Sequence, residues 1–461
     1  MNRKLFTRLR RRGSNRTRTK IIWVAAIFLL VIPNYLISVA RASAGDLVTG
    51  FGLGGKVITD FSSNIDAARA VAVYPDGRIV LAGSSESVTN YLDTDIALAR
   101  YHPDGSLDQK FGDGGLVTTD LNELEISSAV AIQPDGKIVV AGNISRLDRT
   151  HDFLVIRYNE DGTLDSSFGQ GGVVTTDFYN TMDFAADMAI TPNGEIVVAG
   201  TIYWGLPRID FAIARYKANG DLDETFGSGG KVTFGLENAQ ESLSAVALSS
   251  KGEIVLVGDT ITPQPEVFNI DCIVVRLNRD GSPDASFGVD GRVITDFSVV
   301  DRFSDIALTS NGEIVAVGTV EPFPLPRFDF VIARYDRHGS LDQSFGTGGV
   351  VFTDFSMKDD FAFSVAVRPN GRIVVAGTSG NVIGSNENDF ALARYERDGN
   401  LDQSFGSGGL VTTDFSGHID EARAVAILPS GRIIVAGLTW DWRNWPSYPN
   451  RDFALAEYES K

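Results

Sequence analysis

Short runs of apolar residues recur along the chain in groups of four. In one group the runs are GGVVFTDF (348–355), FAFSVAVRPNG (361–371), RIVVAGTS (372–379) and DFALARYERDG (389–399). Valine, isoleucine, phenylalanine and threonine dominate these runs, and Gly or Pro-Asn-Gly separates them, as is typical of β-strands joined by tight turns. Because no run beyond the N-terminal segment has a sustained helical period, the pattern predicts an all-β protein.

The group of four runs occurs seven times. Each copy carries a marker of the type LDQSFGSGG, and successive markers are 60, 57, 58, 61, 58 and 60 residues apart. The markers begin at Leu47, Leu107, Leu164, Leu222, Pro283, Leu341 and Leu401. The seven copies therefore fill the chain after the N-terminal segment, without a linker or a second domain.

A unit of four strands can bury its faces only against neighbouring copies. Propeller blades are such four-stranded sheets, and several of them surround a central channel. We therefore predict a seven-bladed β-propeller in which runs of the AVAV type form the innermost strand a, RIVVAG strand b, DFALARY strand c and GGLVTTDF the outermost strand d. A linear β-solenoid is the alternative, but its repeats are usually much shorter and it would leave two open edges.

The two ends of the repeat array complement each other. The chain has a strand d at Gly54–Phe61 before its first strand a, and it ends with a strand c at Asp452–Tyr458. The last blade thus lacks a strand d, while the N-terminal part has one to spare. Pairing of these segments would close the ring, so residues 45–461 are predicted to form a single seven-repeat domain.

Residues 1–44 differ from the rest of the chain. They contain ten basic residues, no acidic residue, and the apolar run IIWVAAIFLLVIPNYLISVA before Ala42-Ser43-Ala44. This order is typical of a signal peptide, although an uncleaved membrane anchor is the alternative, because about 20 apolar residues can span a bilayer. We expect an exported protein, either secreted, periplasmic or on the cell surface, with membrane contact only through an uncleaved N-terminal segment. Arg10-Arg11-Arg12 would also allow a twin-arginine route.

The repeat array is strongly acidic. The chain has 41 Lys and Arg against 59 Asp and Glu, a net charge of −18, and removal of the ten basic residues before residue 45 leaves a net charge of −28. This charge argues against nucleic acid or an anionic lipid surface as a partner. Cys272 is the single cysteine and lies in the apolar run IDCIVVRL, so it is predicted to be buried. An exported chain without disulfides indicates a bacterial source.

Together, the motifs LDxSFGxGGxVxTDF, PDGRIVVAG and DFALARY resemble those of the delta-60 repeat family of bacterial proteins. The resemblance covers residues 47–461. It implies a β-propeller-like fold and an exported or surface location, and it supplies no catalytic residues.

Each strand c carries an Arg eight residues before the Asp of the following marker. At the junction of the last and first repeats both are absent, because Glu457 and Val48 occupy their positions. Their joint absence predicts a structural ion pair between strand c and the approach to strand d rather than a ligand site, with Asp46 as a substitute at the junction in another register. The pairs are Arg100–Asp108, Arg157–Asp165, Arg215–Asp223, Arg276–Asp284, Arg334–Asp342 and Arg394–Asp402.

A second series of carboxylates stands just before each strand a. In a propeller these residues could circle one mouth of the central channel and hold a hydrated cation weakly, because hard cations prefer oxygen ligands. The alternative is that each carboxylate caps backbone N–H groups of its own turn. The predicted acidic channel ring comprises Asp66, Glu125, Asp183, Glu241, Asp301, Asp360 and Asp420.

The connections between strands b and c differ in every repeat and contain most of the tryptophans. Exposed aromatic side chains in these loops could stack on sugar rings or grip a partner peptide, or they could simply pack on their own loop. The candidate binding residues are Tyr203, Trp204, Trp440, Trp442, Trp445 and Tyr448.

No catalytic motif is present, the four histidines lack metal-ligand spacing, and we expect no cofactor beyond a weakly bound cation. The sequence therefore predicts a monomeric binding or scaffold module for a protein or glycan partner. Two alternatives stay open. One is a propeller-type lyase or glycoside hydrolase that uses carboxylates of the acidic ring as acid and base. The other is a structural protein of the cell envelope.

Overall fold

The computed structural model describes residues 42–61, 65–86, 94–146, 150–205, 208–236, 239–261, 269–321, 327–380, 388–415, 419–441 and 450–461. All of them belong to one compact unit, Ala42–Lys461. The described residues form 28 β-strands and no helix, as the periodicity of the sequence predicts. Within this part of the chain there is accordingly no helix that is long and apolar enough to cross a membrane.

The strands follow one another in the order a, b, c, d. Strands a are β2 (Ile65–Val73), β6 (Leu124–Ile132), β10 (Met182–Ile190), β14 (Gln240–Leu248), β18 (Asp301–Leu308), β22 (Asp359–Val367) and β26 (Ile419–Ile427). Strands b are β3 (Ile79–Glu86), β7 (Ile138–Ser145), β11 (Ile196–Gly205), β15 (Ile254–Ile261), β19 (Ile314–Val320), β23 (Ile373–Gly380) and β27 (Ile433–Asp441).

Strands c are β4 (Thr94–Tyr101), β8 (His151–Tyr158), β12 (Arg208–Tyr216), β16 (Asp271–Leu277), β20 (Asp329–Tyr335), β24 (Asn388–Tyr395) and β28 (Asn450–Tyr458). Strands d are β5 (Leu116–Thr119), β9 (Val173–Thr176), β13 (Lys231–Phe234), β17 (Arg292–Thr295), β21 (Val350–Thr353), β25 (Leu410–Thr413) and, at the start of the chain, β1 (Lys56–Thr59).

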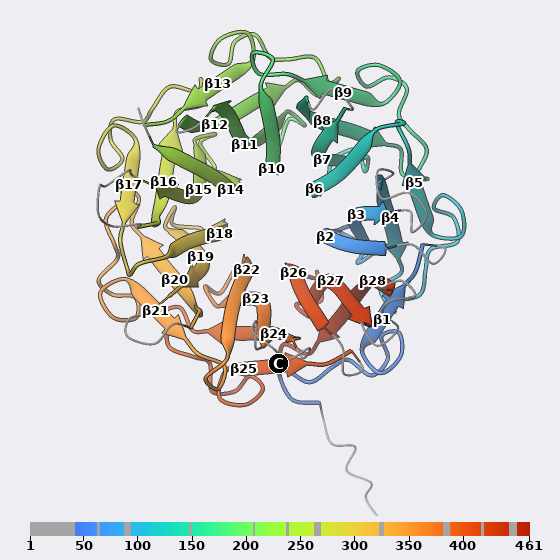
Figure 1. Ribbon diagram of the computed structural model, residues 1–461. Helices are drawn as coiled ribbons and strands as arrows, with labels where there is room; N and C mark the ends of the chain where they lie inside the picture. The colour runs from blue at the N-terminus through green and yellow to red at the C-terminus, as the bar shows by residue number, and fades with distance from the viewer. Residues whose placement is uncertain are drawn as a thin grey trace, which may run out of the picture. The chain divides into compact units, whose positions relative to one another are not determined.

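Consecutive strands pair antiparallel within each group of four. In β22 to β25, for example, Val367 lies opposite Ile373, Thr378 opposite Phe390, and Phe390 opposite Thr413. Figure 1 shows the sheets side by side around a common centre, with strands a nearest to it. The 28 strands are consistent with seven such sheets.

The core lies between neighbouring sheets. Buried apolar side chains of the described residues form seven clusters, and each cluster draws on two adjacent sheets. Strands b and c are covered on both faces, which explains why they are continuously apolar while the innermost strands alternate. Cys272 on β16 is fully buried in one of these clusters, and burial raises the pKa of its thiol well above the usual value.

The first and last strands meet in the same sheet. Strand β1 pairs antiparallel with β28, with Lys56 opposite Ala456 and Thr59 opposite Phe453. Val48 N–H donates to the carbonyl oxygen of Glu457 at 2.9 Å, and the Gly45 N–H donates to Glu459 at 2.7 Å. The two ends of the repeat array are therefore joined both along β1 and through the residues that precede it.

Ala44 is already part of the fold. Its side chain is buried, and its carbonyl oxygen accepts a 2.8 Å hydrogen bond from the Gly406 N–H. In the other sheets the carbonyl of a turn residue takes this place, for instance Asp104 for Gly52 and Asp398 for Gly346. Cleavage directly after Ala44 would remove this acceptor.

Candidate functional site

Every innermost strand contains a β-bulge at the same place. The pairing between strands a and b shifts by one residue, for example between Ala68 and Ala70 in β2 and between Ala422 and Ala424 in β26. A bulge leaves one residue unpaired and re-aims its side chain. We call these seven unpaired residues the bulge ring: Arg69, Ser128, Ala186, Ser244, Ser304, Phe363 and Arg423.

A glycine on strand b makes room for each bulge. At Gly377 of β23, a Cβ atom would stand 1.9 Å from the carbonyl oxygen of Phe361, far inside van der Waals contact. No side chain can be accommodated there unless the backbone moves. The glycine of each RIVVAG run therefore allows strand a to bulge toward the centre.

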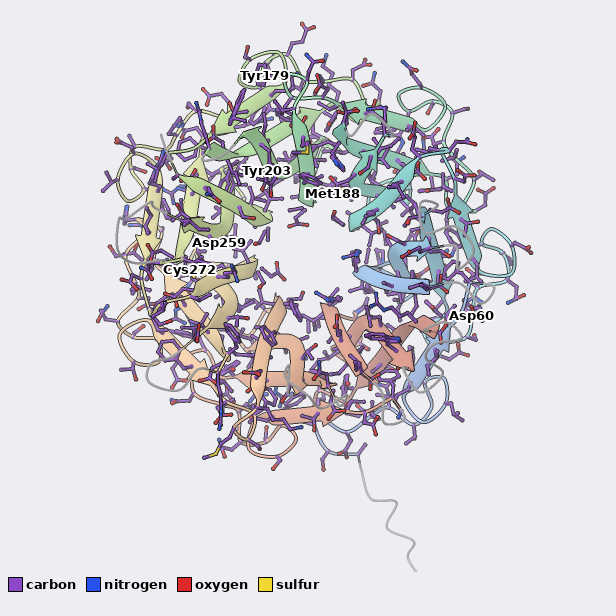
Figure 2. The ribbon with its side chains drawn as sticks, viewed as in Figure 1. Asp60, Tyr179, Met188, Tyr203, Asp259 and Cys272 are labelled. Carbon is purple, nitrogen blue, oxygen red and sulfur yellow. The ribbon has the colours of Figure 1, made fainter. Side chains whose placement is uncertain are left out.

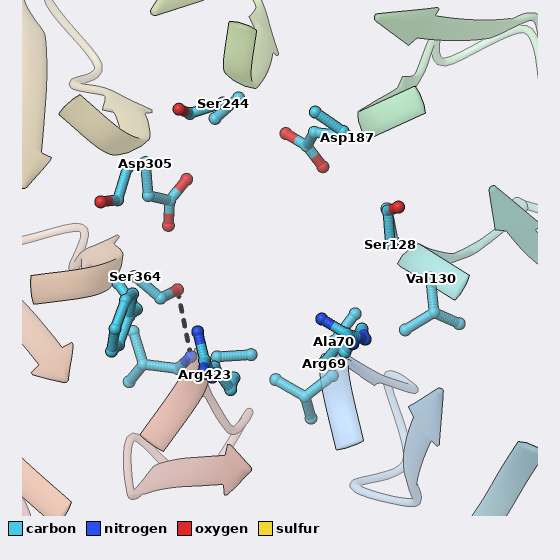
Figure 3. Close-up of a pocket in the computed structure, with 17 residues that line it drawn as sticks. Arg69, Ala70, Ser128, Val130, Asp187, Ser244, Asp305, Ser364 and Arg423 are labelled. Atoms are coloured by element: carbon cyan, nitrogen blue, oxygen red, sulfur yellow. Dashed lines mark hydrogen bonds between the residues drawn. The ribbon is translucent and has the colours of Figure 1, made fainter. Parts of the chain in front are cut away.

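The bulge ring lines a central pocket of about 200 Å³. Figure 3 shows two arginines, Arg69 and Arg423, on one side of the pocket, with Asp187 and Asp305 across from them. Hydroxyl groups of four serines, Ser128, Ser244, Ser304 and Ser364, fill positions around the pocket. The pocket is thus polar and has its positive and negative charges on separate sides.

The two arginines come from neighbouring strands, β2 and β26. The Arg423 guanidinium stacks on Phe363 at 4.4 Å and forms an ion pair with Glu421. Arg69 is exposed to solvent in the pocket, and among the described residues no carboxylate lies within ion-pair distance of it. Partial desolvation by the protein atoms that surround the pocket, and then the charge of Arg423, lower the pKa of Arg69. An anionic group placed here would relieve the repulsion between the two guanidinium groups.

The two carboxylates connect adjacent innermost strands. The N–H of Val246 on β14 donates to Asp187 at 2.8 Å, and that of Val365 on β22 donates to Asp305 at 2.7 Å. Ser364 occupies the same strand position and accepts a hydrogen bond from the Val425 N–H at 3.2 Å. Side chains at this position therefore link three of the strands a, β10, β18 and β22, to the next one, whereas the other four strands have alanine there.

These carboxylates predict a specific pH dependence of stability. Burial, and then the charge of Asp305, raises the pKa of Asp187 from 3.8 to about 7, and burial raises that of Asp305 to about 6. A carboxyl group whose pKa is higher in the folded chain is ionised first in the unfolded chain, so its contribution to stability falls as pH rises from about 4 to 7.

In the Asp187→Asn variant this fall should be smaller by roughly 1–2 kcal/mol. Urea unfolding at pH 5 and pH 8 measures it. An equal difference between the two pH values in the variant and the parent protein would contradict the prediction.

The acidic channel ring predicted from the sequence is wrong as a set of channel-lining groups. Asp66, Glu125, Asp183, Glu241, Asp301, Asp360 and Asp420 are all fully buried. They stand three residues before the bulge ring, behind the pocket wall, and accept hydrogen bonds from backbone N–H groups of their own turns, such as Phe61 to Asp66 at 2.7 Å. The capping alternative therefore describes them better, because an unpaired N–H in this turn would be costly to bury.

Two of the predicted aromatic residues lie in a cluster on β11. The Trp204 ring is 37% exposed, stacks on Tyr179 at 5.3 Å, and donates its indole N–H to Asp210 at 2.7 Å. Tyr203 packs against Phe184 in a T-shaped arrangement. Figure 2 labels Tyr179 and Tyr203 on this side of the ring.

The remaining aromatic candidates belong to the connection after β27. The half-buried Trp440 has the Arg451 guanidinium over its ring at 4.6 Å. Trp442, Trp445 and Tyr448 lie outside the described residues. Among the three candidates that the structure describes, Tyr203 and Trp204 are neighbours on β11 with different ring partners, and Trp440 lies on β27.

The arginine and aspartate residues eight apart in sequence lie side by side. In all six pairs an arginine nitrogen is 2.7–2.9 Å from the partner carboxylate. Each guanidinium also stacks on the marker phenylalanine at 4.4–4.7 Å. At the junction, Arg432 approaches Glu457 at 3.5 Å, and Asp46 instead accepts a hydrogen bond from the Ser43 N–H at 2.6 Å.

Sequence reasoning missed the bulge ring and the pocket that it lines. A bulge adds one residue without interrupting the apolar pattern of a short strand, so its position cannot be read from alternation alone. The only available signal is the recurrent Gly of RIVVAG, which marks a close backbone approach but does not say which residue is pushed to the centre.

Comparison with known proteins supports a β-propeller repeat family. A family model described as "Domain of unknown function (DUF5122) beta-propeller" matches six segments, residues 75–111, 133–168, 191–226, 269–287, 309–345 and 368–405. These segments repeat through the chain; each contains a strand c with the marker, and all except 269–287 also contain strand b. The chain therefore carries the repeats of a β-propeller family.

Solved structures similar to the chain include a polysaccharide lyase, Uly1 (10% identity, 85% of this chain and 90% of the other, TM-score 0.44). Another is an ulvan lyase of family PL25 bound to a saccharide (13% identity, 91% and 95%, TM-score 0.46). A third is the α-L-arabinanase of Penicillium chrysogenum with arabinobiose (9% identity, 88% and 97%, TM-score 0.42). No curated protein matches the chain.

Proposed function

We propose that this protein is an exported, monomeric, seven-bladed β-propeller of the delta-60 type, closed by β1 and β28, that works as a binding module. Its ligand is a protein or glycan that presents a carboxylate group to the central pocket. The observation that carries the proposal is the pair of guanidinium groups, Arg69 and Arg423, on one wall of a polar pocket in an otherwise acidic protein.

The chemistry of the pocket defines the ligand class. A carboxylate can accept hydrogen bonds from both guanidinium groups, and charge-assisted bonds of this kind are the strong ones. Hydroxyl or amine groups on the same ligand would face Asp187, Asp305 and Ser244 on the opposite wall. A uronic acid at the end of a glycan and the C-terminus of a peptide both have this chemistry.

Titration calorimetry with a uronic-acid oligosaccharide, its neutral counterpart and a short peptide separates these sources. We expect Arg69→Gln and Arg423→Gln each to weaken binding of the carboxylate ligand at least about tenfold, because each removes a charged hydrogen-bond donor.

The matched control is Arg302→Gln, which removes the same charge from the exposed start of β18, 51% exposed and 3.7 Å from Asp259. Binding that is weakened equally by all three substitutions would contradict a specific site, as would equal affinity for the neutral oligosaccharide.

A carbohydrate-active enzyme is the second candidate. It is favoured by one observation, the raised pKa of Asp187, about 7, because a general acid must be protonated near neutral pH. Both oxygens of Asp187 already accept backbone N–H groups, from Met188 and Val246 at 2.8 Å, which makes the structural role of this carboxylate the simpler explanation. Depolymerisation of a glycan that is lost in Asp187→Asn would instead favour the enzyme.

A further inference from the structure

The turns that join strands a and b lie at the end of the sheets opposite to the b–c connections, because consecutive strands are antiparallel. The first residue of each turn is of one of two kinds. Four repeats have a large side chain there, and three consecutive repeats have a short hydroxyl side chain. The large residues are Tyr74, Gln133, Arg368 and Leu428, and the short ones are Thr191, Ser249 and Thr309.

Three of the large side chains reach the glycine of the next a–b turn along the chain and donate to its carbonyl oxygen. The bonds run from Tyr74 to Gly136 at 3.1 Å, from Gln133 to Gly194 at 2.8 Å and from Arg368 to Gly431 at 2.9 Å. Leu428 is instead buried in the cluster between the last and first sheets. Large residues at this position therefore close the space between neighbouring turns.

Two of these side chains also bond the buried arginine of their own sheet. The Nη1 atom of Arg157 donates to Oε1 of Gln133 at 3.3 Å, and Arg100 donates to the hydroxyl oxygen of Tyr74. One polar group thus accepts a hydrogen bond from a guanidinium group and donates another to a glycine carbonyl oxygen. A hydroxyl group can do both at a single atom, as that of Tyr74 does.

The short hydroxyl side chains bond their own turns instead. Oγ of Ser249 accepts from the Glu253 N–H at 3.1 Å and donates to the Glu253 carboxylate at 2.9 Å. Oγ1 of Thr309 likewise accepts from the Glu313 N–H at 3.0 Å. Neither hydroxyl group therefore takes the place that the Gln133 amide fills in its repeat.

Two grooves, of about 610 and 350 Å³, lie at these places, one on each side of the turn that begins at Thr309. Both volumes are within the range of about 300–1,000 Å³ that is usual for ligand pockets. A Cβ atom on Gly312 would have no other atom within 4 Å, so the larger groove is open at this glycine. Each groove is lined by a short hydroxyl residue, the buried arginine of the same sheet and the glycine of the next turn: Ser249, Arg276 and Gly312 in the larger, and Thr309, Arg334 and Gly371 in the smaller.

The grooves are basic although the chain as a whole is acidic. Six lysine and arginine residues line them against two glutamates, whereas the chain has 41 Lys and Arg and 59 Asp and Glu. The arginines that pair with the marker aspartates are buried, and Lys251, Arg337 and Arg397 are exposed. This charge favours an anionic ligand. The lining residues with charge are Lys251, Arg276, Arg334, Arg337, Arg368 and Arg397, with Glu253 and Glu313.

We propose that the two grooves form a glycan-binding site, separate from the central pocket and independent of it, that takes an acidic oligosaccharide. Hydroxyl groups of the sugar rings would accept hydrogen bonds from Arg276 and Arg334. The same groups would donate to the carbonyl oxygens of Gly312 and Gly371, as the Tyr74 hydroxyl donates in its own repeat. Carboxylate groups of the sugar would lie against the exposed lysine and arginine side chains.

A peptide suits this arrangement less well than a sugar. The Tyr74 hydroxyl bonds both of its partners through one oxygen atom, whereas a trans peptide bond directs its N–H and C=O groups to opposite sides. A sugar ring carries several hydroxyl groups, each of which can donate and accept. An oligosaccharide that crosses the turn at Thr309 can therefore supply one such group to each groove.

Isothermal titration calorimetry with a tetrasaccharide of galacturonic acid tests the proposal in the Arg69→Gln variant, whose central pocket lacks one of its two arginines. The grooves of this variant should still bind the tetrasaccharide. Adding Ser249→Gln supplies the side chain that Gln133 has in its repeat and fills the larger groove from within. We expect binding to weaken at least about tenfold while Tm stays the same or rises. Because Arg69 and Ser249 are changed separately, loss of binding at the central pocket is distinguished from loss at the grooves.

The matched control is Ser228→Gln, which changes an exposed turn residue whose equivalent in the preceding repeat is Gln170. This substitution should leave binding unchanged. The proposal is overturned if Arg69→Gln does not bind the tetrasaccharide, or if Ser249→Gln weakens binding no more than Ser228→Gln does. Equal affinity for a neutral galactose tetrasaccharide or for a glutamate peptide of the same charge would also overturn it. If Ser249→Gln does not fold, Thr309→Gln takes its place, since it fills the smaller groove.

Discussion

Removal of residues 45–61 should turn the protein into an unstable, self-associating species. The deletion takes away β1 and leaves β28 with an unpaired edge, and exposed edges of this kind pair with other chains. It also removes Phe51, which is fully buried in the cluster between the last and first sheets. Burial of one such side chain stabilises a fold by about 1.5–3 kcal/mol, so the whole segment should contribute several kcal/mol.

Because domains of this kind are stable by only about 5–15 kcal/mol, we expect a large loss of Tm together with a rise in apparent mass on light scattering. The control is Ile58→Lys, which adds a charge to β1 at a side chain that is 50% exposed and leaves the strand pairing in place. A monomeric deletion variant with the Tm of the parent protein would refute the role of β1 in closing the ring.

The all-β class and the repeats could be predicted because they depend on local information. Pro-Asn-Gly and Pro-Asp-Gly turns fix hairpins over a few residues, and the marker spacing fixes the repeat length. The pairing of β1 with β28 could also be predicted. The repeat array begins with a strand d and ends with a strand c, and in every other repeat a strand c pairs with the strand d that follows it. Because the order of strands is the same in every repeat, this long-range contact can be inferred by finding which strand lacks a partner.

The arginine–aspartate pairs were predictable for the same reason. Six repeats carry both residues and the junction lacks both, so the covariation is visible within one chain. The sequence did not indicate what replaces the pair at the junction. There Glu457 replaces the arginine of strand c, and Arg432, directly before strand b, lies 3.5 Å from it. This contact depends on how far the Arg432 side chain extends across the sheet, which the spacing of residues in the sequence does not indicate.

The central pocket could not be predicted in this way. The sequence places a carboxylate before each strand a, and a regular strand would direct it toward the mouth of the channel. The observed turn folds back, buries Asp66 and its equivalents against backbone N–H groups, and then bulges three residues later. The residue that reaches the centre is therefore Arg69 rather than Asp66, and the pocket is partly basic where the sequence indicated an acidic ring.

The largest effect of a single substitution is expected at the Arg394–Asp402 pair. Arg394 is fully buried, lies 2.8 Å from Asp402, and donates to the carbonyl oxygen of Ser460 at 3.0 Å. In Asp402→Ala its charge would be left with only uncharged partners. Loss of one partner of a buried ion pair costs about 3–5 kcal/mol, which chemical denaturation at pH 7 will measure as a lower midpoint.

Two further variants show whether the loss of stability comes from the unpaired charge of Arg394. Glu224→Ala removes an exposed carboxylate from the marker of another repeat and should change the free energy of unfolding by less than about 0.5 kcal/mol. Arg394→Met combined with Asp402→Leu removes both charges and should recover much of the loss, because apolar groups can replace a buried pair at little cost.

The pH dependence gives an independent check on the same pair. Burial alone would raise the pKa of Asp402, but hydrogen bonds from Ser404 and the charge of Arg394 outweigh it and lower the pKa. The contribution of this carboxylate is therefore present above its unfolded pKa and is lost as pH falls through the folded value. The difference in stability between the parent protein and Asp402→Ala should shrink below about pH 4, and a difference that stays constant down to pH 3 would show that packing, not charge, holds the pair together.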